Sequence, residues 1–100
     1  MTDTTVAKEI FNQLGGNKFK LMVGAKNLIA GKDYLAFKIS SRNKTKANYI
    51  KIKLNAMDTY DIFFMKVYKY NVKVLAAVGS IYNDQLQDVF AYKTGLFTRL

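Results

Sequence analysis

The residues best suited to chemistry are the lysines and the tyrosine of the stretch Tyr49–Leu54. They occupy every second position, and isoleucine or leucine fills the positions between them. Because side chains alternate between the two faces of a strand, this pattern predicts a strand with one aliphatic and one cationic face. Lysine neutralises phosphate groups and an aromatic ring stacks on a base, so such a face is typical of nucleic-acid binding.

Other parts of the chain add to this cationic face. Neighbouring predicted strands contribute lysines and Tyr34, the polar loop Ser40–Asn48 adds three positive charges, and Lys26 lies beside a flexible glycine bend. Only two arginines occur, and since paired arginine hydrogen bonds are the usual means of reading bases, we expect nonspecific or single-strand-preferring binding. The candidate nucleic-acid-binding residues are Lys20, Lys26, Tyr34, Lys38, Arg42, Lys44, Lys46, Tyr49, Lys51, Lys53 and Lys73.

The same lysine and tyrosine pattern also fits two different roles. Lysines on exposed strands keep a sheet soluble and oppose edge-to-edge pairing, and tyrosine is common in strands of any function. A cationic face would also bind an acidic protein surface. Nucleic-acid binding, a solvated surface and an acidic protein partner therefore all stay open at this point.

Catalysis is not expected. The chain has no histidine and no cysteine, and it holds only seven carboxylates. Asp58 lies in a predicted turn and Asp61 borders a strand, while Asp84 and Asp88 lie four residues apart on a predicted helix. Structural or solvent-exposed positions explain both pairs better than acid–base or metal chemistry does. We expect no catalytic residue, no metal site and no cofactor.

The net charge of +9 is concentrated in the middle of the chain. Between Lys18 and Lys73 there are thirteen lysines and arginines against three aspartates, whereas the two flanks are nearly neutral. No apolar run approaches the roughly 18 residues of a membrane span, and Met1–Lys8 lacks the pattern of a secretory signal. One hundred residues form a typical single domain, so we expect one domain over residues 1–100 in the cytoplasm.

The hydrophobic pattern predicts an α+β fold. Four to five antiparallel strands form a meander sheet, and an N-terminal and a C-terminal helix pack on one face of it. The apolar run Ile62–Met65 does not alternate, which predicts a strand covered on both faces, and Gly79-Ser80 is expected to end the last strand. The predicted helices are Thr4–Leu14 and Tyr82–Tyr92, and the predicted strand segments are Lys18–Val23, Leu28–Ala30, Tyr34–Ile39, Tyr49–Leu54, Tyr60–Tyr70 and Val72–Val78.

Several blocks of the chain resemble a family of short, uncharacterised bacteriophage and prophage proteins. These blocks are Leu14–Phe19 with Gly24–Asn27, then Lys51–Asp61, and finally Tyr82–Leu86 through Thr94–Phe97. The resemblance implies a small phage-encoded protein in the host cytoplasm, and it transfers no functional residue. It favours nucleic-acid handling or interference with a host protein over metabolism.

The leading prediction is a phage-type protein that binds nucleic acid through a lysine and tyrosine sheet face and a basic loop. The alternative is a phage-encoded interaction module that inhibits a host or defence protein through an acidic surface on that protein. A third possibility is a homo-oligomer whose exposed strands pair between subunits. No membrane partner is expected.

Overall fold

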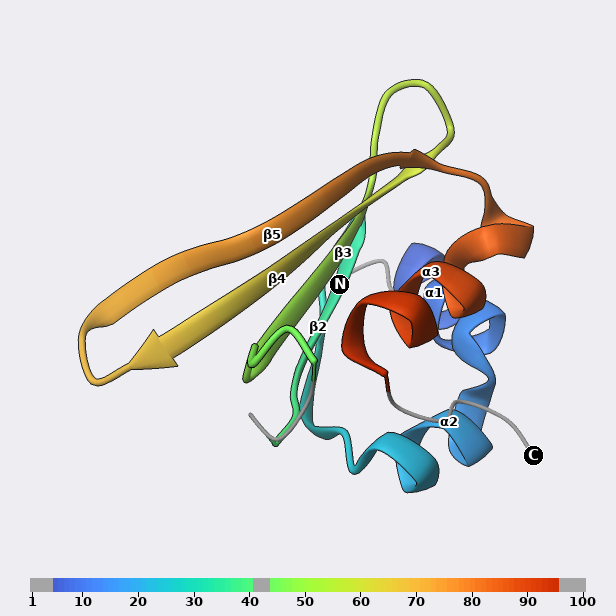
Figure 1. Ribbon diagram of the computed structural model, residues 1–100. Helices are drawn as coiled ribbons and strands as arrows, with labels where there is room; N and C mark the ends of the chain where they lie inside the picture. The colour runs from blue at the N-terminus through green and yellow to red at the C-terminus, as the bar shows by residue number, and fades with distance from the viewer. Residues whose placement is uncertain (1–4, 41–43, 96–100) are drawn as a thin grey trace.

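The computed structural model describes residues 5–40 and 44–95 and shows an antiparallel sheet with helices (Figure 1). The strands follow one another in the order β1-β2-β3-β4-β5, so each strand pairs with its neighbours in the sequence. This arrangement confirms the predicted α+β meander. The elements are α1 (Thr5–Leu14), α2 (Gly16–Val23), β1 (Lys26–Ala30), β2 (Tyr34–Lys38), β3 (Tyr49–Leu54), β4 (Tyr60–Tyr68), β5 (Asn71–Ile81), the short 3-10 helix η1 (Asn83–Gln85) and α3 (Leu86–Thr94).

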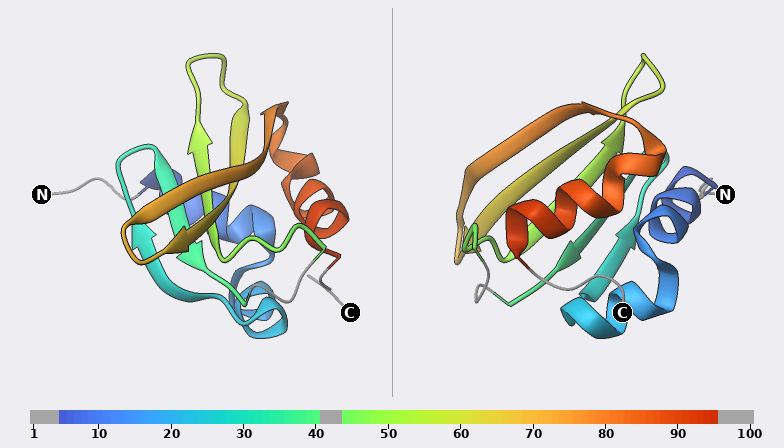
Figure 2. Two further views of the ribbon diagram at one scale, coloured as in Figure 1. Left: turned by 60° about the vertical axis from the view of Figure 1, so that its left-hand side comes forward. Right: turned by 45° about the vertical axis from the view of Figure 1, so that its right-hand side comes forward.

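The core lies between the helices and one face of the sheet (Figure 2). Phe90 of α3 is at its centre, with ring centroids 5.1 Å from Phe19, 6.1 Å from Phe37 and 6.4 Å from Phe64. All four rings are fully buried. The aliphatic face of β3 packs into the same cluster, as the alternation in this stretch predicts. The N-terminal and C-terminal helices therefore cover one face of the sheet, as expected.

The predicted strand Lys18–Val23 is wrong, because these residues belong to α2. Phe19 and Val23 are buried four residues apart, which is one turn of a helix, while Leu21 between them is 82% exposed. Gly24 ends the helix in the left-handed conformation with φ 68°, and its N–H donates to the carbonyl of Lys20. Six alternating residues satisfy a strand period and a helix period almost equally well.

Two predictions for the last strands also need correction. The run Ile62–Met65 is not covered on both faces, since Ile62 and Phe64 are fully buried while Phe63 and Met65 are half-buried on the other face. Gly79-Ser80 does not end β5, which continues to Ile81. Ser80 takes a positive φ of 56°, and its N–H donates to Oδ1 of Asp61 at 3.3 Å, so the bent backbone stays attached to β4.

The last hairpin, formed by β4 and β5, has longer strands than the rest of the sheet. β3 has six residues, β4 has nine and β5 has eleven, and the last residue of β4 that pairs with β3 is Met65, opposite Tyr49. Beyond that point β4 and β5 pair only with each other, and a two-residue turn joins Tyr68 to Asn71. We term residues Lys66–Lys73 the arm; Figure 1 shows it extending past the ends of β2 and β3.

No helix in the described part of the chain is long and apolar enough to cross a membrane.

Candidate nucleic-acid interface

Lysines from distant parts of the sequence meet at one end of the sheet. The register sets Lys26 opposite Lys38, Lys38 opposite Tyr49 and Tyr49 opposite Met65, and the arm leaves the sheet from this end. The C-terminal end of α3 reaches the same place, because Lys44 N–H donates to the Thr94 carbonyl at 2.8 Å. We term this region the basic end, and its described lysines are Lys26, Lys38, Lys44, Lys46, Lys66, Lys69, Lys73 and Lys93.

The segments that form the basic end contain no acidic residue. They comprise residues 23–27, 38–40, 44–49, 65–74 and 93–95. Asp88 borders the region, since it lines the groove between β5 and α3 together with Tyr92 and Lys93. Eight positive charges are thus placed at this end of the molecule, with Lys26 and Lys38 on one face of the sheet and Lys66 and Lys73 on the other. Because their segments carry no acidic residue, they create a positive potential over this end.

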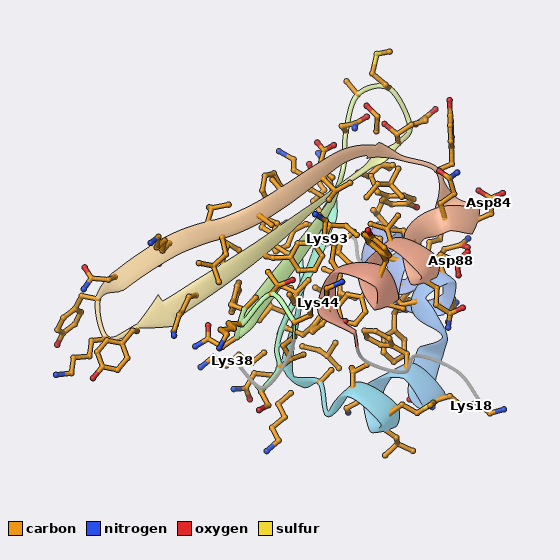
Figure 3. All side chains as sticks on the ribbon, in the orientation of Figure 1. Lys18, Lys38, Lys44, Asp84, Asp88 and Lys93 are labelled. Carbon is orange, nitrogen blue, oxygen red and sulfur yellow. The ribbon has the colours of Figure 1, made fainter. Side chains whose placement is uncertain are left out.

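Among the described residues, most acidic side chains lie toward the other end of the sheet. Asp33 is in the turn between β1 and β2, Asp58 in the turn between β3 and β4, and Asp61 near the start of β4, with Lys32 and Lys53 among them. Figure 3 shows Asp84 near the start of α3, away from Lys38 and Lys44, which lie toward the arm. Along the strands, one end of the sheet is therefore strongly positive, whereas the other end carries mixed charges.

Two pairs of lysines face each other directly across neighbouring strands. Lys26 of β1 is opposite Lys38 of β2, and Lys66 of β4 is opposite Lys73 of β5. Like charges at directly opposite positions destabilise a sheet. The first pair also borders a pocket of ≈ 340 Å³ that Gly24 and Ser40 help to line. An anion bound between the lysines of either pair would remove their repulsion.

The described part of the loop before β3, which begins at Lys44, is held in place by contacts with the end of α3. Besides the bond from Lys44 to Thr94, the Thr45 hydroxyl donates to the carbonyl of Lys93. Lys44 Nζ lies 5.1 Å from the centroid of the Tyr92 ring, in a cation–π geometry. The negative end of the α3 dipole further favours lysines here. These contacts fix Lys44 against the C-terminal end of α3.

The open face, which is the sheet face without helices among the described residues, is partly occupied by its own side chains. Lys51 Nζ lies 4.6 Å from the centroid of the Tyr34 ring, and Lys53 Nζ lies 4.0 Å from Oδ2 of Asp33. The Tyr34 ring also packs on Gly31, where an added Cβ would come within 2.1 Å of it. Both lysines thus already have electrostatic partners, and the Tyr34 ring is partly covered.

The structure separates the candidate residues into groups. Tyr34, Lys38, Tyr49, Lys51 and Lys53 share the open face, as the alternation predicts. Lys26 lies in β1, and the pairing of β1 with β2 shifts register between Lys26 and Ile29, which fits the bend or bulge expected at this point of the chain. The loop residues Lys44 and Lys46 are exposed at the basic end, and Arg42 lies outside the described residues.

Two of the candidate residues do not lie where the sequence pattern predicts. Lys20 is on helix α2 and not on the sheet. Lys73 faces Lys66, on the same side of the sheet as the buried Phe64, because a β-bulge beside Phe64 shifts the register of β5. The expectation that both residues belong to the cationic sheet face is therefore wrong.

Sequence reasoning missed three lysines of the basic end, namely Lys66, Lys69 and Lys93. The faces of Lys66 and Lys69 depend on how far β4 continues past β3, and Lys93 depends on the direction of α3. One signal was present in the sequence: the predicted strand Tyr60–Tyr70 is nearly twice as long as its neighbour Tyr49–Leu54. When one strand is longer than its neighbour, its extra residues continue beyond the end of that neighbour.

The aspartates near the β3–β4 turn have structural partners. Asp61 Oδ1 accepts hydrogen bonds from Asn55 Nδ2 at 3.1 Å and from the Ser80 N–H at 3.3 Å. Asp58 is exposed and occupies a positive φ of 61° in the turn. Across residues 5–40 and 44–95, no group of three or more histidine, cysteine, aspartate or glutamate side chains could hold a metal ion.

In comparisons with known proteins, no family model, no curated protein and no solved structure matches the chain. The resemblance to short phage proteins therefore stays a prediction.

Proposed function

We propose that the protein binds nucleic acid through the basic end, mainly by contacts to phosphates and with little reading of base sequence. The observation that carries this proposal is the meeting of eight described lysines at one end of the sheet, in segments that contain no acidic residue. Lysine is a compact point charge that suits phosphate, whereas base recognition favours the fork of arginine.

The arrangement of the lysines favours a polyanion over a role in solubility alone. Lysines that only keep a protein soluble need not lie directly opposite one another on neighbouring strands, where they repel. Two such pairs nevertheless occur, namely Lys26 with Lys38 and Lys66 with Lys73. A nucleic acid carries closely spaced charges along its whole length and so neutralises several lysines at once, with release of its counterions. In this proposal the protein acts in the cytoplasm of a host cell, in keeping with the phage proteins that it resembles.

A salt titration of binding tests this function. Labelled DNA of random sequence, single-stranded and duplex, is titrated with the protein at about 50 to 200 mM salt. We expect micromolar or tighter binding at the low end and a loss of at least tenfold in affinity across the range, since each phosphate contact adds about 0.9 to the slope of log K against log salt for a duplex. No binding at the lowest salt would refute the proposal.

Matched variants locate the surface that binds. The triple change Lys26→Gln, Lys38→Gln and Lys46→Gln removes three charges from the basic end. The control, Lys8→Gln, Lys18→Gln and Lys32→Gln, removes three exposed charges elsewhere. We expect the first triple to weaken binding much more than the control. Equal losses would mean that net charge alone attracts the nucleic acid and that the basic end is not a site.

The open face is tested separately. Lys51→Gln and Lys53→Gln together remove its two central charges, which already interact with Tyr34 and Asp33. We expect a smaller loss than from the basic-end triple. A larger loss would move the site from the basic end to the open face.

An acidic host protein is the second candidate partner. It is favoured by apolar exposure on the arm, where Tyr68 is 64% and Val72 is 63% exposed, because protein interfaces use such side chains. A phage-encoded inhibitor of this kind would bind one protein tightly and at fixed stoichiometry, and it would show no affinity for DNA at moderate salt. The same salt titration therefore distinguishes the two functions.

A further inference from the structure

We propose that the arm inserts into the major groove of duplex B-form DNA. This inference rests on the proposed function and adds to it the form of the nucleic acid and the element that enters it. The arm is the part of the basic end that projects from the rest of the sheet, and it holds Lys66, Lys69 and Lys73. The remaining lysines of the basic end would then contact the phosphates that flank the groove.

The dimensions of the arm fit that groove. Beyond Met65, the last β4 residue paired with β3, the hairpin continues to the turn at Lys69 and Tyr70. At about 3.3 Å per residue this extension is roughly 15 Å long. A two-stranded ribbon enters the major groove of B-DNA, which is about 12 Å wide and about 8.5 Å deep. The arm is therefore long enough to reach the base edges while the body of the protein stays outside.

The charge of the arm is uniformly positive. No aspartate or glutamate occurs between Asp61 and Asp84, so the arm, Lys66–Lys73, is free of acidic side chains. Lys66 and Lys73 face each other across the ribbon, and Lys69 lies in the turn. Inside a groove the two phosphate backbones lie on either side of the ribbon, and lysines at its base and at its tip can each approach phosphates.

The uncharged side chains of the arm also suit a groove. Tyr70 is 99% exposed at the tip, and Tyr68 and Val72 are both more than 60% exposed. In water these rings and methyl groups make no stabilising contacts. In the major groove, apolar side chains can contact thymine methyl groups, and a tyrosine hydroxyl can form a hydrogen bond with a base edge. The deep, narrow major groove of A-form RNA does not admit such a ribbon, so the inference is specific to DNA.

The arm is braced where it leaves the sheet. Asn48 Nδ2 donates to the Val67 carbonyl at 2.9 Å, and the Val67 N–H donates to Asn48 Oδ1 at 2.8 Å. The Asn48 N–H also donates to the Met65 carbonyl at 3.0 Å. These three bonds extend the pairing of β4 beyond the end of β3. A braced arm loses less conformational freedom on binding than a loose loop would, which strengthens binding.

The first experiment removes the charges of the arm. The triple change Lys66→Gln, Lys69→Gln and Lys73→Gln is compared with the control triple at Lys8, Lys18 and Lys32, on a duplex of about 20 base pairs and on a single strand of the same sequence. Three lost phosphate contacts lower the duplex salt slope by about 2 to 3. We expect that change for the arm triple alone, with a smaller effect on the single strand. An unchanged duplex slope would overturn the inference and leave the proposed function standing.

The second experiment blocks one groove at a time. A duplex whose cytosines carry glucosylated hydroxymethyl groups has a filled major groove, and netropsin fills the minor groove of an unmodified duplex. We expect the wild-type protein to bind the glucosylated duplex at least tenfold more weakly, and the netropsin-treated duplex with a much smaller loss that reflects only the positive charge of netropsin. The opposite result, or tighter binding to the single strand than to the duplex, would contradict insertion of the arm. Failure to bind any of these DNAs would instead refute the proposed function.

Discussion

The carboxamide of Asn48 takes the place of a further β3 residue beside Val67. It donates to the Val67 carbonyl at 2.9 Å and accepts from the Val67 N–H at 2.8 Å, which is the pattern of a paired strand residue made by a side chain. Val67 is the second residue of the arm, so this contact decides how firmly the arm is held to the sheet. The contact is made by an asparagine amide, which is neutral, and so it does not depend on pH or salt.

We expect Asn48→Ala to loosen the arm without unfolding the core. Two hydrogen bonds are lost and the Val67 backbone must pair with water, which costs about 1–3 kcal/mol. Hydrogen exchange should accelerate at the Val67 amide and stay slow at Ile50, and duplex DNA should bind more weakly. Asn12→Ala, an exposed position on α1, serves as the control. Unchanged exchange at Val67 would show that the arm is held by other contacts.

Lys38→Glu should have opposite effects on stability and on binding. It turns the directly opposed pair Lys26 and Lys38 into an oppositely charged pair, which raises the free energy of unfolding by about 0.5 kcal/mol. The same change removes two units of positive charge from the basic end and should weaken DNA binding. Urea denaturation and the salt titration measure the two effects, with Lys32→Glu as the control. If Lys38→Glu were less stable than the wild type and bound DNA with the same affinity, Lys38 would not be a residue that weakens the fold and strengthens DNA binding.

Phe90→Ala should be among the most damaging single changes. Phe90 is fully buried and contacts three other buried rings, including Phe19 at 5.1 Å between centroids. Loss of a buried phenylalanine leaves a cavity and typically lowers the free energy of unfolding by about 3–5 kcal/mol. Leu21→Ala, at a position that is 82% exposed, should change it by less than about 0.5 kcal/mol. Denaturant titrations of both variants give the comparison.

Tyr60 should contribute to alkaline unfolding. Burial, and after it the negative charges of Glu9 and Asp58, raise the pKa of Tyr60 above its ordinary value of 10.0. The folded protein therefore holds the phenol proton more firmly than the unfolded chain does. The corresponding stability is fully present below about pH 10 and is lost as the pH rises through the folded pKa.

Tyr60→Phe removes this titration, so its free energy of unfolding should fall less between about pH 9 and 11 than that of the wild type. Tyr70→Phe controls for the loss of a hydroxyl, because Tyr70 is 99% exposed. Denaturant titrations across this pH range measure the difference. Equal slopes for the wild type and Tyr60→Phe would assign the alkaline loss to other groups.

The sequence was most informative where one period dominated. The alternation of Tyr49–Leu54 and the three- and four-residue steps of α1 each match a single kind of element, and both predictions hold. Lys18–Val23 fails because its apolar residues satisfy two periods at once, and the choice is made by packing of Phe19 against Phe37 and Phe90. Gly79-Ser80 fails because Asp61 bonds to the Ser80 N–H and keeps the bent backbone on the sheet.

The site was harder to predict than the fold. Alternation correctly placed Lys51 and Lys53 on one face, but it gave no information about which end of the sheet each lysine occupies. The basic end depends on strand directions, on the extra length of β4 and β5, and on the bulge that turns Lys73 toward Lys66. These are properties of pairing between strands, and no single segment of sequence contains them.

The outer margin of the arm is formed by β5, which is the edge strand of the sheet and has no further strand beside it among the described residues, and Val74 next to the arm is 54% exposed. Ribbons of this kind promote strand addition between molecules and, at high concentration, aggregation. Lys66, Lys69 and Lys73 oppose such contacts, because two arms can pair only by bringing their positive charges together. The free protein is thus kept dispersed by the same charges that duplex DNA would neutralise.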